Sequence, residues 1–206
     1  MSTQNQESGL PYQENGPAEK RNIFWFLSQD DTASFQNLLI TYTNKNILTA
    51  AMLGCASRVI LQAIPMVLVC GKNRAIPAVQ YAEHSGYDIR YADSDSSASE
   101  LLEPGDGKGP VAAILETGED GMSPTQAGAV LGRILEYVCA ATNHPNLAIL
   151  IDDLSSLGQV PHIENTLAMS RKINIRFCMT TEKMSEVAAV YPATYIKIVE
   201  NCAVLS

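Results

Sequence analysis

Residues 147–153 read Leu-Ala-Ile-Leu-Ile-Asp-Asp, and this stretch decides the fold. Five consecutive apolar residues with no polar alternation predict a strand that is buried on both faces, which is typical of a parallel sheet covered by helices. The two aspartates follow where such a strand leaves the core, so their carboxylates can reach solvent or a ligand. The stretch therefore predicts an α/β protein with Asp152 and Asp153 at a strand end.

Short apolar runs of the same kind alternate with helical patterns along the chain. We expect strands at 47–53, 66–70, 87–92, 111–115, 147–151 and 175–179. Helical patterns lie at 33–42, 55–64, 75–85, 124–141, 161–172 and 183–190. This alternation is typical of a parallel sheet with helices on both faces. The sequence therefore predicts a three-layer α/β fold with a mostly parallel sheet of about six to seven strands.

The chain of 206 residues, 46% of them hydrophobic and 17% charged, fits one globular domain. Residues 1–22 are rich in Gln, Asn, Glu, Ser, Gly and Pro, which predicts a flexible tail before a single α/β domain at 23–206. Acidic residues concentrate in two expected loops, 93–108 and 116–122, where Lys108 is the one base. We interpret them as solvated loops, with a divalent cation or a basic partner as the alternative.

Charge and cysteine usage limit the classes of partner. Twenty-two acidic and fourteen basic residues give a net charge of −8, which argues against direct binding of a nucleic-acid backbone. Five widely spaced cysteines are typical of reduced thiols, and no signal pattern or apolar run of about 20 residues occurs. We therefore expect a cytoplasmic protein without a membrane span.

A basic cluster is formed by Arg171, Lys172 and Arg176. It is either an interaction surface or a solvated helix end.

The strand that ends in Asp152 has the form of a Walker B segment, in which the carboxylate holds Mg²⁺ beside phosphates. The phosphate loop GxxxxGK[ST] that should accompany it does not occur. The segment closest to this pattern is Gly71-Lys72-Asn73, which lies between an expected strand and an expected helix. Two other segments, 54–58 and 107–109, differ more from the pattern. We therefore expect no catalysis by the isolated chain and no cofactor, with Mg-ATP required only if the chain binds nucleotide.

The segment 147–161 resembles the Walker B region of the TraG/TraD family, the coupling proteins of conjugation and type IV secretion. The family pattern is a hydrophobic strand, Asp-Glu-Phe, two small residues, an aliphatic residue, Gly, a polar and an aliphatic residue, and often Pro. The likeness continues through 163–171, 173–181, 184–187 and 198–202, so about sixty residues match in order and spacing. It implies a RecA-like P-loop sheet.

The resemblance also has departures. Asp153 stands where the family carries the glutamate that orients water, and Thr180 or Thr181 stands where a glutamine contacts nucleotide. The likeness therefore implies a non-catalytic module of a mobile element that binds other conjugation or secretion proteins and leaves self-association open. One alternative is a divergent Mg-nucleotide-binding or hydrolysing ATPase, with Asp152 on Mg²⁺ and Gly71, Lys72, Thr180 and Thr181 on nucleotide. Another is a Rossmann-like small-molecule domain with its ligand near Gly71 or Thr117-Gly118.

Overall fold

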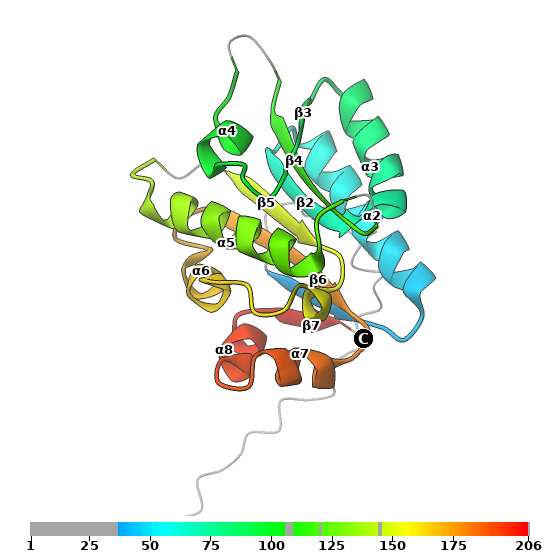
Figure 1. The fold of residues 1–206 in the computed structure, drawn as a ribbon, viewed down its shortest axis with the longest axis vertical. Coiled ribbons are helices and arrows are strands. Elements are labelled where there is room, and N and C mark those ends of the chain that lie inside the picture. Colours follow the sequence, from blue (N-terminus) through cyan, green and yellow to red (C-terminus); the bar gives the residue numbers. More distant parts are fainter. Residues whose placement is uncertain (1–36, 106–108, 120, 144–145, 206) are drawn as a thin grey trace, which may run out of the picture.

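The fold is a single sheet of seven parallel strands, in the order β3-β4-β2-β5-β6-β1-β7 (Figure 1). The computed structural model describes residues 37–105, 109–119, 121–143 and 146–205. The strands are β1 (Leu38–Thr41), β2 (Met66–Gly71), β3 (Asp88–Tyr91), β4 (Val111–Thr117), β5 (Leu147–Ile151), β6 (Ile175–Thr181) and β7 (Ala203–Leu205). This sheet confirms the predicted three-layer parallel architecture, which is consistent with a RecA-like fold.

Helices cover both faces of the sheet (Figure 1). One face carries α2 (Lys45–Leu61) and α3 (Lys72–His84). The other carries α4 (Ala98–Leu102), α5 (Pro124–Ala140), the 3-10 turn η2 (Leu154–Leu157), α6 (Ile163–Met169), α7 (Met184–Val190) and α8 (Tyr195–Glu200). Within the described ranges, no helix has the length and apolar character needed to cross a bilayer.

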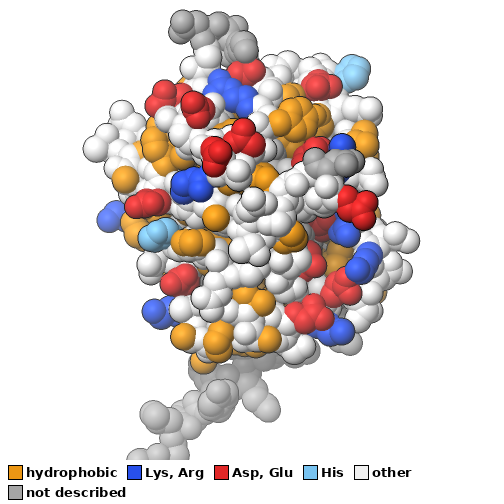
Figure 2. Space-filling view, in the orientation of Figure 1, with side chains coloured by type: hydrophobic (Ala, Val, Ile, Leu, Met, Phe, Trp, Pro, Cys, Tyr) orange, Lys and Arg blue, Asp and Glu red, His pale blue; other side chains and the backbone are white. Residues whose placement is uncertain are grey.

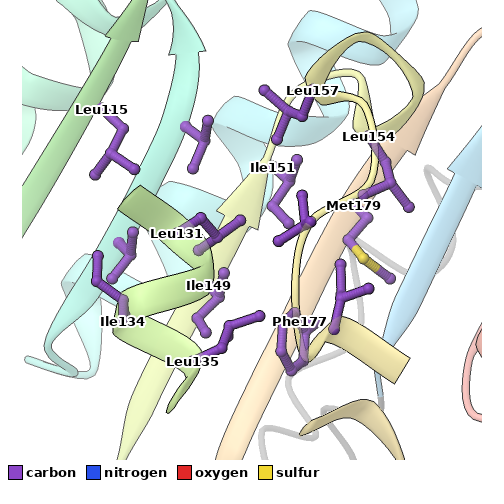
Figure 3. Close-up of a cluster of buried hydrophobic side chains, with 14 of the residues drawn as sticks. Leu115, Leu131, Ile134, Leu135, Ile149, Ile151, Leu154, Leu157, Phe177 and Met179 are labelled. Atoms are coloured by element: carbon purple, nitrogen blue, oxygen red, sulfur yellow. The ribbon is translucent and has the colours of Figure 1, made fainter. Parts of the chain in front are cut away.

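Helix α5 forms the centre of the larger hydrophobic layer. Ser123 caps its first turn in a reciprocal box with Gln126, and Pro124 occupies the first helical position, as the sequence predicted. Its apolar stripe, which includes Leu131 and Leu135, packs against side chains of β4, β5 and β6 (Figure 3). Burial of this stripe supplies hydrophobic stabilisation that holds α5 across the middle of the sheet.

The predicted helix at 33–42 is wrong where the structure describes it, because Leu38–Thr41 form β1. Leu38, Leu39 and Ile40 are buried, and β1 lies between β6 and β7. A short apolar run that is buried on both faces has no amphipathic period, so its pattern alone does not separate helix from strand. The predicted tail at 1–22 and the first part of that helix lie outside the described residues.

The predicted strand at 47–53 is also wrong, because it forms the first half of α2. Asn44 caps this helix, and buried positions such as Leu48, Met52 and Cys55 recur at helical spacing. The run contains Ala, Leu and Met, which favour a helix when tertiary packing permits one. Gly54, considered as part of a phosphate loop, therefore lies inside a helix and forms no loop.

The acidic segment 93–108 is not one continuous loop. Its middle forms α4, which begins with a capping box between Ser97 and Glu100. The guanidinium group of Arg133 on α5 donates a 2.6 Å hydrogen bond to the carbonyl oxygen of Ser94 and ties the segment to the helix layer. Lys108 lies outside the described residues, and the second acidic segment begins within β4. The described part of the chain contains no group of three or more His, Cys, Asp and Glu side chains that could hold a metal ion.

Candidate functional site

The candidate site lies at the carboxyl edge of the sheet, where β5 and β6 end side by side. Ile151, the last residue of β5, pairs with Met179 of β6, so Asp152 and Thr180 become neighbours. The Thr180 hydroxyl donates a 3.2 Å hydrogen bond to Asp152 Oδ1. The structure therefore brings together the predicted acid and one of the two predicted threonines.

Asp152 is buried and paired with a cation. Its side chain is 4% exposed, and its Oδ2 lies 2.6 Å from Nη1 of Arg74, a residue of the first turn of α3. Burial raises the pKa of the Asp152 carboxyl, while the Arg74 guanidinium and the Thr180 hydroxyl act in the opposite direction. Both oxygens of the predicted metal ligand are therefore in contact with protein donors.

Asp153 follows in a left-handed backbone conformation, with φ at +63°, which aspartate tolerates better than most residues. Its backbone N–H donates to the Thr180 hydroxyl oxygen at 3.0 Å, and its Oδ1 accepts from the Ser155 hydroxyl at 2.6 Å. Thr181 lies next to this group, 3.5 Å from Ser155 Oγ. The turn thus holds the Asp153 carboxylate next to the Arg74–Asp152 ion pair, with Ser155 as its own hydrogen-bond partner.

Lys45 is a site residue that sequence reasoning missed. It begins α2 directly after β1, and its Nζ lies 2.7 Å from Oε1 of Glu182, just beyond the end of β6. The Glu182 carboxylate raises the pKa of the Lys45 ammonium group through a hydrogen bond and its charge. The one local signal was Asn44, a good N-cap directly before a lysine, but the strand ahead of it was interpreted as helix.

An open cleft of about 450 Å³ lies between the ends of β2 and β4. The helix that follows β2 packs on one face of the sheet and the helix that follows β4 packs on the other, an arrangement that commonly creates a ligand crevice. The cleft is lined by Gly71, Lys72, Asn73, Arg74, Thr117, Gly118 and Glu119. The predicted residues Gly71 and Lys72 thus line a cleft that adjoins the Asp152 group through Arg74.

The basic cluster lies at the opposite end of the strands from the candidate site, where the strands begin. Arg171 and Lys172 are exposed after α6, and Arg176 is the second residue of β6, near the amino end of that strand. Arg176 Nη1 makes a long hydrogen bond of 3.4 Å to Gln62 Oε1. Because these residues lie at the strand beginnings, they form a surface that is separate from the group at the strand ends.

Charged side chains of the site therefore form ion pairs with one another. Two acids, Asp152 and Glu182, pair with two cations, Arg74 and Lys45, across neighbouring strand ends. Comparisons of the chain with family models, curated proteins and solved structures give no match.

Proposed function

We propose that this chain is a non-catalytic coupling-protein-like module, similar to TraG/TraD proteins, that acts in a conjugation or type IV secretion system by binding other transfer proteins. The non-catalytic part of the proposal rests on the pairing of Asp152 with Arg74 at 2.6 Å, and the coupling-protein part rests on the resemblance of 147–202 to the family. In P-loop phosphoryl-transfer enzymes the corresponding acid binds Mg²⁺, and a lysine contacts the phosphates. Here the acid is in contact with an arginine.

The lysine next to the site supports the same proposal. Mg²⁺ at Asp152 would compete with Arg74 for the carboxylate, and a phosphate at Lys45 would compete with Glu182 for the ammonium group. One N–H group of the first turn of α2 is also in use, because Asn44 Oδ1 accepts a 3.0 Å hydrogen bond from the Asn46 N–H. Helix N–H groups that are used by a side-chain cap are withdrawn from phosphate binding.

Calorimetric titration of the full chain with Mg-ATP tests the non-catalytic part of the proposal. We expect no heat of binding at millimolar nucleotide and no phosphate release. The matched variants are Arg74→Ala, which removes the cation next to Asp152, and Arg171→Ala, which changes an exposed arginine at the beginning of the strands. Neither variant should bind Mg-ATP if the chain itself does not. Binding of Mg-ATP by the unaltered chain would contradict the proposal and favour the Mg-nucleotide alternative.

Binding assays with purified coupling ATPase and relaxase from the same mobile element test the partner. We propose that the cluster Arg171, Lys172 and Arg176 contributes to that surface, because it is the basic group within the segment that resembles the family. Charge reversal in Arg171→Glu/Lys172→Glu should weaken binding. The single variant Arg171→Glu should weaken it as well, and Lys197→Glu, which makes the same change of charge at an exposed position of α8, serves as its control. Binding that is unchanged by the double variant would exclude this surface as the contact.

The cleft favours a second candidate function, binding of a small molecule. It combines a lysine, an arginine, a hydroxyl and a carboxylate at the ends of two parallel strands, which is the usual position of ligands in such sheets. Thermal denaturation with AMP, ribose 5-phosphate and inorganic phosphate tests this candidate. A ligand-dependent rise in Tm that is lost in Thr117→Val would support it, and no rise with any of the three would exclude this class of ligand.

A further inference from the structure

The two outermost strands of the sheet, β3 and β7, differ in how they are protected against pairing with a further strand. At the β3 edge, Asp88 and Arg90 form a 2.7 Å ion pair, and charges on an edge strand discourage further strand pairing. At the other edge, β7 consists of Ala203, Val204 and Leu205, none of which is charged. Within the described part of the chain β7 pairs only with β1, so no described strand covers its outer side.

Exposed apolar side chains lie on β7 and on helix α8, which is in contact with β7. Val204 is 42% exposed, and Ile196 on the adjacent helix α8 is 67% exposed. In the orientation of Figure 1, hydrophobic side chains gather at the lower end of the molecule, over α7 and α8 (Figure 2). An uncharged edge beside an apolar surface is the combination that an added strand would cover.

We propose that residues 23–27 of this chain, Ile-Phe-Trp-Phe-Leu, bind the outer edge of β7 as an additional antiparallel strand. These residues lie outside the described ranges. All five are apolar, and β-branched and aromatic residues favour strands. In a strand, Ile23, Trp25 and Leu27 share one face, which can cover the exposed side chains of α8 and β7.

The chain connection sets the direction of the added strand. The Ala203 N–H donates a 2.7 Å hydrogen bond to the Asn37 carbonyl oxygen, so the beginnings of β1 and β7 are adjacent. Nine residues, 28–36, separate the segment from Asn37 and can span roughly 30 Å, whereas two strand spacings amount to about 10 Å. If residues 23–27 run antiparallel to β7, they end at the beginning of β7, close to Asn37. If they ran parallel to β7, they would end at its far end, and residues 28–36 would have to return along the length of the strand.

The tether also favours this occupant over a separate chain. A segment joined by a short linker has an effective concentration of about a millimolar, far above the micromolar concentration of a second copy in solution. Binding would remove both the apolar segment and the outer edge of β7 from water. It would therefore prevent edge-to-edge association of two sheets.

Trp25 makes the proposal directly measurable, because it is the single tryptophan of the chain. We expect the full chain to emit tryptophan fluorescence at short wavelength and to resist acrylamide quenching, as an indole buried against an apolar surface does. Ile196→Asp and Val204→Asp should each shift the emission to longer wavelength and increase quenching. Leu61→Asp changes a side chain that is 74% exposed at the end of α2, and should leave both signals unchanged.

Three results would overturn the proposal. One is emission of a solvent-exposed tryptophan from the unaltered chain. Another is a short-wavelength emission that persists in the folded Ile196→Asp variant, whose site lies on the surface and whose folding is checked by far-UV circular dichroism. The third is a short-wavelength emission that appears only as the chain dimerises with rising concentration, which would assign the edge to a second copy.

Discussion

Arg74 and Asp152 form an ion pair with Nη1 and Oδ2 2.6 Å apart, although 78 residues separate them in the sequence. The pair joins the first turn of α3 to the end of β5, and thereby connects the cleft to the acid of the Walker-B-like segment. The two partners differ in their contact with solvent: the Asp152 side chain is buried, whereas the Arg74 side chain is 41% exposed. Removal of the arginine leaves a buried carboxylate without its cation.

Arg74→Ala should destabilise the protein by about 1–3 kcal/mol at pH 7, less than for a fully buried pair because solvent screens the exposed guanidinium. Loss of the cation raises the pKa of Asp152 further, and the ionised carboxylate is the costly form. The destabilisation should therefore shrink as pH falls and the carboxyl becomes protonated, and it should be smaller at pH 4 than at pH 7. Urea denaturation of both proteins at the two pH values measures it. Arg74→Ala/Asp152→Asn should recover part of the loss at pH 7, and no recovery would contradict the explanation.

Tyr191 should make the fold sensitive to alkali. Burial raises the pKa of its phenol to about 12, from 10.0, so between these pH values the unfolded chain ionises first. This contribution to stability is complete below about pH 10 and disappears as pH rises through about 12, and it amounts to about 2–3 kcal/mol.

Tyr191→Phe tests that expectation. At pH 8 the variant should be about 1–2 kcal/mol less stable, because the Val160 N–H loses its hydroxyl acceptor at 3.0 Å. Between pH 8 and pH 11 its stability should fall less than that of the unaltered protein, as measured by urea denaturation. Tyr87 retains its own alkaline effect in both proteins, since its pKa is also raised to about 12. Parallel pH curves would show that Tyr191 does not carry the effect.

Gly132→Ala should destabilise the protein even though alanine favours helices. A Cβ at position 132 would lie 2.8 Å from Cδ of Pro161, a rigid ring that follows η2. The helical preference of alanine over glycine is about 1 kcal/mol, whereas overpacking of a core typically costs about 1–3 kcal/mol. We expect a net loss in Tm. Ala129→Gly at an exposed position of α5 is the matched control and should lower stability by about the helical preference alone. A rise in Tm for Gly132→Ala would show that α5 moves freely away from Pro161.

Asn37→Ala should be among the most damaging substitutions of a polar residue. The Asn37 amide donates to the Ser170 hydroxyl at 2.8 Å and to the Asn201 carbonyl at 3.1 Å, and accepts from the Phe177 N–H at 3.3 Å. Loss of these buried bonds should cost about 2–4 kcal/mol in thermal or urea denaturation. Asn46→Ala, at an exposed position in the first turn of α2, is the control and should change stability by less than about 0.5 kcal/mol. An equal effect of the two variants would contradict a structural role for the network.

Much of the fold follows from local patterns. Leu147–Ile151 were predicted as a central buried strand and form β5, because a continuous apolar run ended by two acids has few other stable solutions in a protein of this class. Ser123, Pro124 and Gln126 predicted the start of α5 because capping is a local interaction. Asp152 and Thr180 were both candidates for the site, and the pairing of β5 with β6 makes them neighbours.

Other features depended on packing that no local pattern contains. Leu38–Thr41 and Ile47–Leu53 are both short apolar runs, and only the covering layers decide that the first is a strand and the second part of a helix.

The sequence by itself determined a parallel α/β protein with acids at the end of β5, because periodicity and capping act over a few residues. Only the tertiary structure decided that Arg74 pairs with Asp152 after β5 and Lys45 with Glu182 after β6, since both ion pairs join elements far apart in the chain. The strand order is what brings those ends to one edge of the sheet, and it results from the packing of two helical layers rather than from any local stretch.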